Sequence, residues 1–156
     1  MLSVVLVDPQ IPPNTGNVAR LCSCTGTNLY LVGSLGFFLS DRHLKRAGLD
    51  YWDDLTMKYI ESLEKLQEEY SGNNYYYVST KAQKLYTKID YRANDFLVFG
   101  SETKGLPENL IYSNIDNAIR IPMINDKRSL NLANAVSVVL YEAIRQTQPF
   151  VDKHNL

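Results

Sequence analysis

Short apolar runs alternate with helical patterns along this chain, and this alternation restricts the possible folds more than any other feature of the sequence. The first run, Leu2 to Val7, is almost free of polar residues, as in a strand that is covered on both faces. Similar runs predict strands over residues 28–32, 75–78, 96–99 and 118–121. Helical periodicity predicts helices over residues 15–24, 41–47, 61–70, 108–112 and 131–146. This order indicates an α/β fold with a mostly parallel sheet flanked by helices.

The chain fits a single domain spanning residues 1–156. Its 156 residues contain no internal repeat, linker or low-complexity segment. The formal net charge is −1, so an RNA partner would have to be attracted by local basic patches, or by patches paired across an oligomer. The sequence shows neither a signal peptide nor a run of ~20 apolar residues, so we expect a cytoplasmic protein without a membrane span.

Metal-ligating residues are scarce. The only cysteines, Cys22 and Cys24, form a C-x-C pair inside an expected helix, where their side chains diverge. The only histidines are His43 and His154, and no partner for the cysteines lies at a useful spacing. We therefore expect no metal site, and we expect both cysteines to be small core residues.

Three polar segments follow strands, and each is marked by Gly or Pro. The segment IPPNTGNVAR follows the first strand, GSETKGLP follows the strand at 96–99, and PMINDKRSLNLAN follows the last strand. In an α/β sheet, ligands bind at the loops that leave the carboxyl ends of the parallel strands. The three segments are therefore expected to line one site.

The middle segment matches a phosphate-binding loop only in part. Gly100 and Gly105 have the spacing of the glycines in G-x-x-x-x-G-K-[ST], but Leu106 and Pro107 stand in place of the lysine and the hydroxyl residue. Glu102 lies between the glycines and would repel a phosphate. Both glycines are expected to adopt positive φ in a tight turn. The segment therefore favours a ligand without phosphates that is cationic or donates hydrogen bonds.

Several polar residues also have purely structural explanations, which the sequence leaves open. Asn14 lies where it can cap the helix expected from residue 15. Ser129 or Asn131, but not both, can cap the last helix. Arg20 lies among apolar residues, where its guanidinium either reaches solvent through its stem or serves a pocket. A function for these residues therefore needs more than their local sequence.

Taken in order, three segments resemble the three motifs of the SPOUT methyltransferases, on the branch of the tRNA ribose methylases. They are PPNTGNVARLC near the start, FGSETKGLP about two thirds along, and IPMINDKRSLNLANAVSVVLYEA near the end. The match covers nearly the whole chain, and we expect no added RNA-binding domain. The resemblance implies an α/β fold whose C-terminal part, at about residues 75–146, forms a trefoil knot, a rare exception to unknotted topology.

The resemblance also implies an activity. It predicts an enzyme that uses S-adenosylmethionine to methylate the ribose 2′-oxygen of the wobble nucleotide, cytidine or uridine, in tRNA, without a metal. It predicts a homodimer whose active sites take residues from both chains, with Asn14 and Arg20 reaching the partner's cofactor. A guanidinium has a pKa above ~12, so Arg20 is expected to fix the adjacent phosphate and to favour the developing alkoxide, rather than to remove a proton.

The motifs imply catalytic and cofactor-binding residues, and the basic clusters add candidates for contact with RNA. The catalytic residues implied are Arg20, Asn14, Ser129 and Asn131. The cofactor-binding residues implied are Ser79, Gly100, Glu102, Gly105, Ile121, Met123, Ser129 and Leu130. Candidates for binding the RNA substrate are Asn17, Arg42, Arg46, Lys104, Arg128 and Tyr141.

Other functions remain compatible with the residues alone. The target could be a different site in tRNA or a site in rRNA. A nucleotide-binding regulatory module on an open α/β sheet is a further alternative, although the missing lysine after Gly105 argues against it. A protein that binds RNA without a cofactor is the third.

Overall fold

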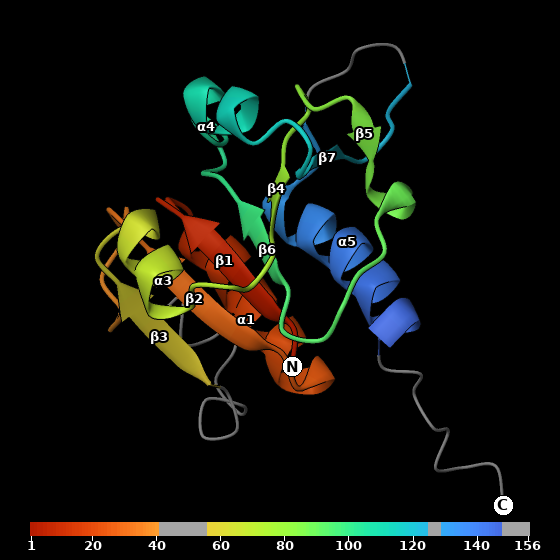
Figure 1. Cartoon of the computed structure of the whole chain (residues 1–156). Coiled ribbons are helices and arrows are strands. Elements are labelled where there is room, and N and C mark those ends of the chain that lie inside the picture. The colour runs from red at the N-terminus through yellow and green to blue at the C-terminus, as the bar shows by residue number, and fades with distance from the viewer. Residues whose placement is uncertain (41–55, 125–128, 148–156) are drawn as a thin grey trace, which may run out of the picture.

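The computed structural model describes residues 1–40, 56–124 and 129–147. Within these residues, seven parallel strands form one sheet with the order β3-β2-β1-β6-β4-β7-β5 (Figure 1). The strands are β1 (Ser3–Val7), β2 (Asn28–Val32), β3 (Met57–Ile60), β4 (Tyr75–Val78), β5 (Lys84–Leu85), β6 (Phe96–Phe99) and β7 (Ala118–Arg120). The expected parallel α/β fold is confirmed. Some predictions lie outside the described residues, namely the helix over residues 41–47, which contains Arg42 and Arg46, and the candidate Arg128.

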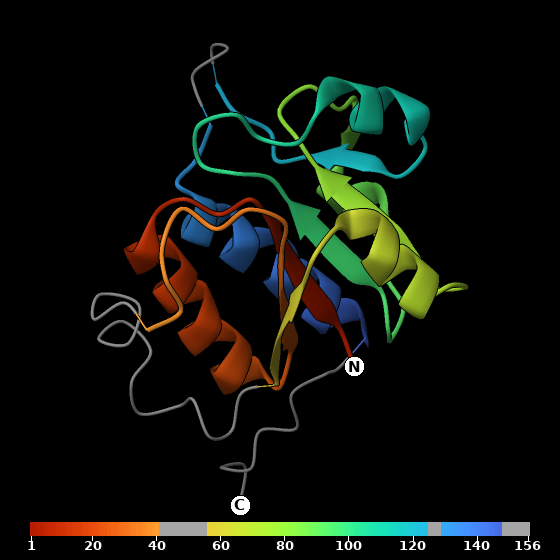
Figure 2. The same cartoon turned by 90° about the vertical axis from the view of Figure 1, so that its left-hand side faces the viewer.

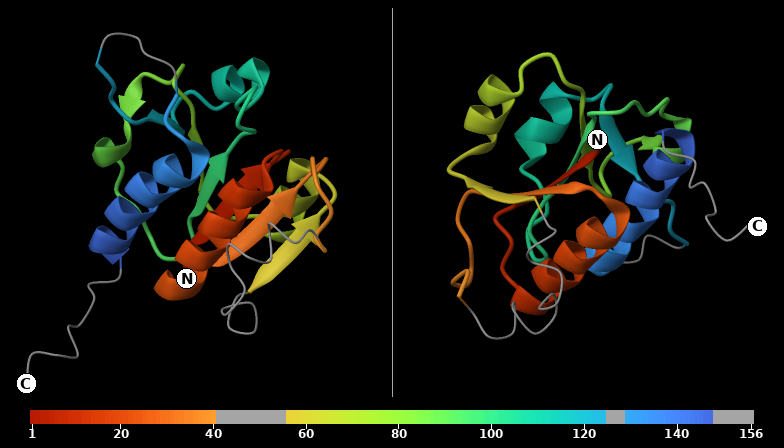
Figure 3. Two further views of the ribbon diagram at one scale, coloured as in Figure 1. Left: turned by 180° about the vertical axis from the view of Figure 1, so that it is seen from behind. Right: turned by 90° about the horizontal axis from the view of Figure 1, so that it is seen from below.

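Helices cover both faces of the sheet. They are α1 (Pro12–Thr25), α3 (Leu63–Glu69), α4 (Glu108–Ser113) and α5 (Leu132–Thr147), with a 3-10 turn η1 at Tyr86–Lys88. Helices α1 and α5 lie side by side on one face, and α3 and α4 lie on the other (Figures 2 and 3). The sheet is therefore the middle of three layers.

The central strands show why the apolar runs lack alternation. The sheet has a hydrophobic core on each face. Val4 and Leu6 of β1 belong to the core that includes α1 and α5, whereas Val5 belongs to the core that includes residues of α3 and α4. All three side chains are fully buried. A strand whose two faces are both covered needs apolar residues at successive positions, and this is the pattern in the sequence.

The two edge strands were not predicted. β3 is half exposed along its length, and β5 has only two residues. Neither carries the continuous apolar run that marks β1 or β6, because an edge strand has fewer side chains to bury. The signal for both strands was therefore too weak to separate them from loops.

Two local predictions are wrong. Asn14 does not cap the first helix, because the helix begins at Pro12 and Ile11 holds the N-cap position. Proline suits the first helical turn, where its fixed φ and missing N–H cost nothing, and this moves the start of the helix toward the N-terminus. Cys22 is buried as expected, which raises the pKa of its thiol to about 12, but Cys24 is exposed. Residues two positions apart point to opposite sides of a helix, so only one of the two reaches the core.

No helix in the described parts of the chain combines the length and the apolar character needed to cross a lipid bilayer.

Candidate active site

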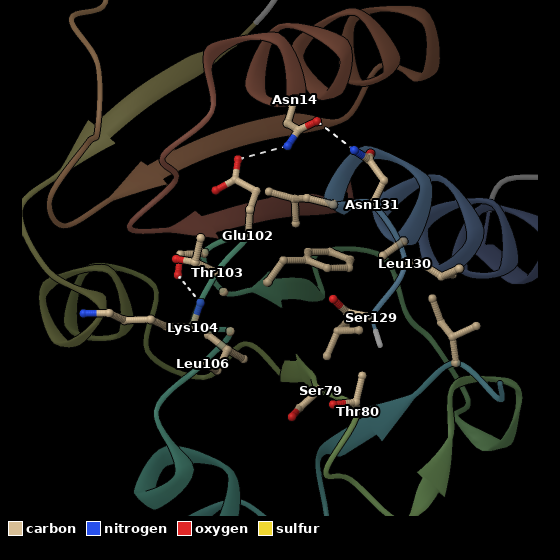
Figure 4. Close-up of a pocket in the computed structure, with 18 of the residues that line it drawn as sticks. Asn14, Ser79, Thr80, Glu102, Thr103, Lys104, Leu106, Ser129, Leu130 and Asn131 are labelled. Carbon is tan, nitrogen blue, oxygen red and sulfur yellow. Dashed lines mark hydrogen bonds between the residues drawn. The ribbon is translucent and has the colours of Figure 1, made fainter. Parts of the chain in front are cut away.

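The loops that leave the carboxyl ends of β1, β4, β6 and β7 surround one pocket of about 820 Å³ (Figure 4). The three polar segments predicted to share a site all contribute to it. A pocket of this size is typical of sites for cofactor-sized ligands. Its lining residues are Ile11, Asn14, Val78–Lys81, Phe99–Leu106, Ile121, Met123, Ser129–Leu132 and Ala135.

The β6 loop folds back on itself, and its two glycines serve different purposes. Gly105 has φ +66 and donates a backbone hydrogen bond to the Ser101 carbonyl at 2.9 Å. Gly100 does not have a positive φ, contrary to expectation. A Cβ on Gly100 would lie 2.0 Å from the carbonyl carbon of Gly105. Gly100 is therefore required for close backbone approach, and Gly105 for its left-handed conformation.

Glu102 of this loop is bound to the start of α1. Its carboxylate accepts hydrogen bonds from the backbone N–H groups of Gln10 at 2.8 Å and Ile11 at 3.1 Å. It also accepts one from Asn14 Nδ2 at 3.2 Å. The carboxylate thus joins the β1 and β6 loops, which are distant in sequence.

Asn14 continues this chain of hydrogen bonds toward α5. Asn131 Nδ2 donates to Asn14 Oδ1 at 2.9 Å (Figure 4). Asn131 Oδ1 also accepts from the backbone N–H of Ala133 at 2.9 Å. Asn131 therefore caps α5, which settles the alternative left open between Asn131 and Ser129. Ser129 is exposed and lines the pocket without capping the helix.

The predicted residues fall into two groups. All of the residues assigned to the cofactor line the pocket, together with the catalytic candidates Asn14 and Asn131. Arg20, Asn17 and Tyr141 are exposed on α1 and α5 and do not line it. The structure therefore brings the three motifs together but leaves these three side chains outside the pocket of their own chain.

Some lining residues were missed. Thr80 and Lys81 directly follow Ser79 at the end of β4, so the rule that ligands gather at strand ends could have identified them. Ile11 also lines the pocket, although 41% of it is exposed. No sequence signal separated Ile11 from the prolines beside it.

The charges of the pocket lie at its edge. Lys81 pairs with Glu108 of α4. The Lys104 side chain points away from the interior (Figure 4). The Glu102 carboxylate already accepts three hydrogen bonds, and the remaining walls combine hydroxyl and amide groups with apolar side chains such as Phe99 and Leu132. Within the described residues, no three His, Cys, Asp or Glu side chains are grouped to hold a metal ion.

The sequence profile of the family described as SpoU rRNA Methylase matches residues 1–141, which is most of the chain. The chain belongs to the SpoU rRNA methylase family. This confirms the resemblance seen in the three motifs, because the SpoU methylases are part of the SPOUT group. The pocket at the carboxyl edge of the sheet is therefore the candidate active site of a SpoU methylase.

Curated relatives of this SpoU methylase cover it nearly from end to end. The Escherichia coli (strain K12) relative, named tRNA (cytidine(34)-2′-O)-methyltransferase, is 42% identical over 147 residues, which are 94% of this chain and 94% of the relative. The Bacillus subtilis (strain 168) relative carries that name provisionally. It is 47% identical over 148 residues, or 93% of this chain and 92% of its own. The family profile is named for rRNA, whereas these relatives are named for tRNA.

Solved structures share the fold of this SpoU methylase. One, described as giving insights into the 2-OH methylation of C/U34 on tRNA, has a TM-score of 0.89 and 41% identity, and the match covers 94% of this chain and 95% of that one. The SpoU methyltransferase AviRb from Streptomyces viridochromogenes, in complex with the cofactor AdoMet, has a TM-score of 0.82 and 25% identity. That match covers 94% of this chain and 57% of AviRb.

Proposed function

We propose that this SpoU methylase transfers a methyl group from S-adenosylmethionine to the ribose 2′-oxygen of the wobble nucleotide of tRNA, a cytidine or uridine at position 34. The observation that carries the proposal is the meeting of all three motifs in one pocket. The relatives named for this reaction support it, because they align with almost the whole chain.

The residues of the pocket fit S-adenosylmethionine. When bound, this cofactor supplies a methyl group on a sulfonium, which is an excellent leaving group. Apolar side chains such as Phe99, Ile121 and Leu132 offer walls for an adenine ring, and Ser79 and Ser129 offer hydroxyls for a ribose. Lys104 is directed away from the interior and so does not repel a cationic ligand (Figure 4).

The catalytic residues are proposed to hold the acceptor in line with the methyl group. Alignment in a shielded pocket can account for most of the acceleration of a reaction with so good a leaving group. Asn14, Ser129 and Asn131 would position ribose and cofactor. A guanidinium is a poor general base, so the role proposed for Arg20 is to bind the neighbouring phosphate and to favour the alkoxide that develops at the 2′-oxygen.

We infer that the active enzyme is a homodimer whose sites combine residues of both chains. Arg20 is exposed on α1 and lies outside the pocket of its own chain, which supports a role in the pocket of a partner. Asn14, which was expected to act across the dimer in the same way, lies in the pocket of its own chain. We therefore propose that Arg20 alone reaches into the pocket of the partner.

Further parts of the proposal concern the whole molecule. We also propose a single domain over residues 1–156, a trefoil knot at about residues 75–146 and a cytoplasmic location. Lys104, Asn17 and Tyr141 are proposed to bind the RNA, together with Arg42, Arg46 and Arg128. The three that the structure describes are exposed, which is compatible with this role.

Methyl transfer to defined RNAs tests the function. Purified protein is incubated with S-adenosylmethionine labelled in the methyl group and with unmodified tRNA transcripts, and the methylated nucleotide is mapped by mass spectrometry. We expect 2′-O-methylation at position 34. Cofactor binding without labelling of any tRNA would overturn the assignment, and labelling of rRNA fragments instead would identify the alternative target.

A further inference from the structure

We propose that Glu102 is a positioning residue that caps α1 from the β6 loop and thereby aligns Asn14 with Asn131. This inference concerns the same site as the proposed function. Its kinetic consequences rest on that function. The hydrogen bonds themselves are a property of the folded chain. Glu102 would accordingly hold the site in shape and would not act on the reacting atoms.

Helix α1 begins without a side-chain cap of its own, and the N–H of Asn14 bonds to the Ile11 carbonyl at 3.1 Å. Its N-cap residue, Ile11, makes no side-chain cap hydrogen bond, and no acidic residue lies in the first turn. Pro12 and Pro13 carry no N–H, so they remove two of the donors that a helix start usually leaves unpaired. The donors that remain just before the helix, on Gln10 and Ile11, both point to the Glu102 carboxylate.

The carboxylate is well placed for this task. It lies 91 residues from Ile11 in sequence, yet it places a carboxylate at the positive end of the α1 dipole. Its two oxygens already accept three hydrogen bonds, out of about four acceptor positions on a carboxylate. A general base for the 2′-hydroxyl would have to give up part of this bonding, so the geometry favours a structural use of the charge.

Glu102 also determines which way the Asn14 amide faces. Asn14 Nδ2 donates to Glu102, which leaves Asn14 Oδ1 to accept from Asn131. The reversed amide would place its oxygen against the carboxylate and its NH₂ group against that of Asn131. Since Asn131 also caps α5, one chain of hydrogen bonds runs from Glu102 to the first turn of α5.

This chain connects the parts that the proposed reaction must align. Glu102 belongs to the loop that lines the cofactor pocket, Asn14 lies on the helix that carries Arg20, and Asn131 begins α5. A displacement of about 1 Å between reacting groups can reduce a rate roughly a hundredfold. Loss of the Glu102 carboxylate would therefore slow methyl transfer by letting α1 shift against the pocket.

Amide hydrogen exchange tests the contact without any substrate. In Glu102→Gln, the remaining side-chain oxygen can still accept from Ile11 and Asn14, whereas the NH₂ group faces the N–H of Gln10, so this N–H should exchange roughly tenfold faster or more. Glu68→Gln, on the exposed side of α3, is the matched control and should leave the exchange rate of the Gln10 N–H unchanged. Unchanged exchange in Glu102→Gln would overturn the proposal whatever the protein's activity.

Kinetics test the consequence. We expect kcat of Glu102→Gln to fall about a hundredfold, with a smaller change in the Kd of S-adenosylmethionine and with the shape of the pH profile retained. Loss of the acid limb of that profile would instead identify Glu102 as the general base.

A double variant tests whether the residues act together. Asn14→Ala combined with Glu102→Gln should be little slower than the slower of the two single variants, and additive losses would contradict a shared chain of hydrogen bonds. Wild-type protein that showed no methyl transfer would remove the proposed function but leave the exchange test intact.

Discussion

Asn131 donates a hydrogen bond to Asn14 across 117 residues of sequence, with 2.9 Å between Asn131 Nδ2 and Asn14 Oδ1. The bond joins the last of the three motifs to the first. Asn131 also caps α5, and α5 packs against α1, which carries Asn14. One asparagine therefore contributes both to the stability of the helix pair and to the shape of the pocket.

Asn131→Ala should lower the free energy of unfolding by about 1–2 kcal/mol, because α5 loses its cap and Asn14 loses a donor. Denaturant unfolding followed by circular dichroism measures this change. Ser129→Ala is the control for stability, since Ser129 does not cap the helix. Equal destabilisation by the two substitutions would show that the cap is assigned to the wrong residue.

Alanine at the two glycines of the β6 loop should have unequal effects. In Gly100→Ala the new Cβ would meet the backbone of Gly105 at 2.0 Å, so we expect a loss of more than ~3 kcal/mol, or failure to fold. In Gly105→Ala nothing lies within 4 Å of the new Cβ, and only the strain of φ +66 remains, about 1–2 kcal/mol. Thermal unfolding of both variants decides the order, and a reversed order would contradict this explanation of the loop.

Arg20→Ala should abolish methyl transfer while the Kd for S-adenosylmethionine, measured by calorimetry, stays near the wild-type value. The reason is that Arg20 is proposed to act on the RNA phosphate and the developing alkoxide, whereas the residues assigned to the cofactor all line the pocket without it. Arg20→Lys should not restore activity, because an ammonium cannot reproduce a bidentate contact to phosphate.

Mixed dimers test whether Arg20 acts across the interface. Coexpression of an Arg20→Ala chain with an Asn131→Ala chain, each carrying a different tag, gives hybrids with one complete site if Arg20 serves the partner's pocket. We expect activity to return in these hybrids. Hybrids as inactive as both parents would place Arg20 in its own chain's site.

Lys104→Ala should weaken tRNA binding and leave cofactor binding unchanged, because the ammonium points away from the pocket interior (Figure 4). The loss of one phosphate contact should reduce the slope of log K against log salt by about 1. Lys65→Ala, on exposed α3, is the matched control. A weaker affinity for S-adenosylmethionine in Lys104→Ala would show that the side chain reaches the cofactor.

Glu142 should make stability depend on pH in acid. Hydrogen bonds from Arg145 and Gln146 lower the pKa of Glu142 to about 2. A carboxylate whose pKa is lower in the folded state stabilises the protein fully above its unfolded pKa, near ~4.3, and that contribution disappears as the pH falls toward 2. Glu142→Gln should therefore destabilise the protein at pH 7 and lose its effect near pH 2, as measured by urea unfolding. An equal effect at both pH values would contradict this cause.

Much of the architecture follows from local sequence. The run over β1 predicts a strand buried on both faces, because only apolar side chains can occupy such positions, and the same argument identifies β4 and β6. The half-exposed β3 and the two-residue β5 escape this argument because they bury too little. The start of α1 was misplaced because Asn14 suits a cap, whereas Pro12 suits the first turn better.

By itself, then, the chain's sequence determined the parallel α/β sheet, the three loops at one edge and the family to which they belong, since these depend on periodicity and on short motifs. Only the tertiary structure decided what Glu102 binds, which of Ser129 and Asn131 caps α5, and why Gly100 has no side chain. Each of these depends on atoms from distant parts of the chain meeting within a few ångströms. Such distances arise from the packing of α1 and α5 on the sheet, and no local pattern encodes them.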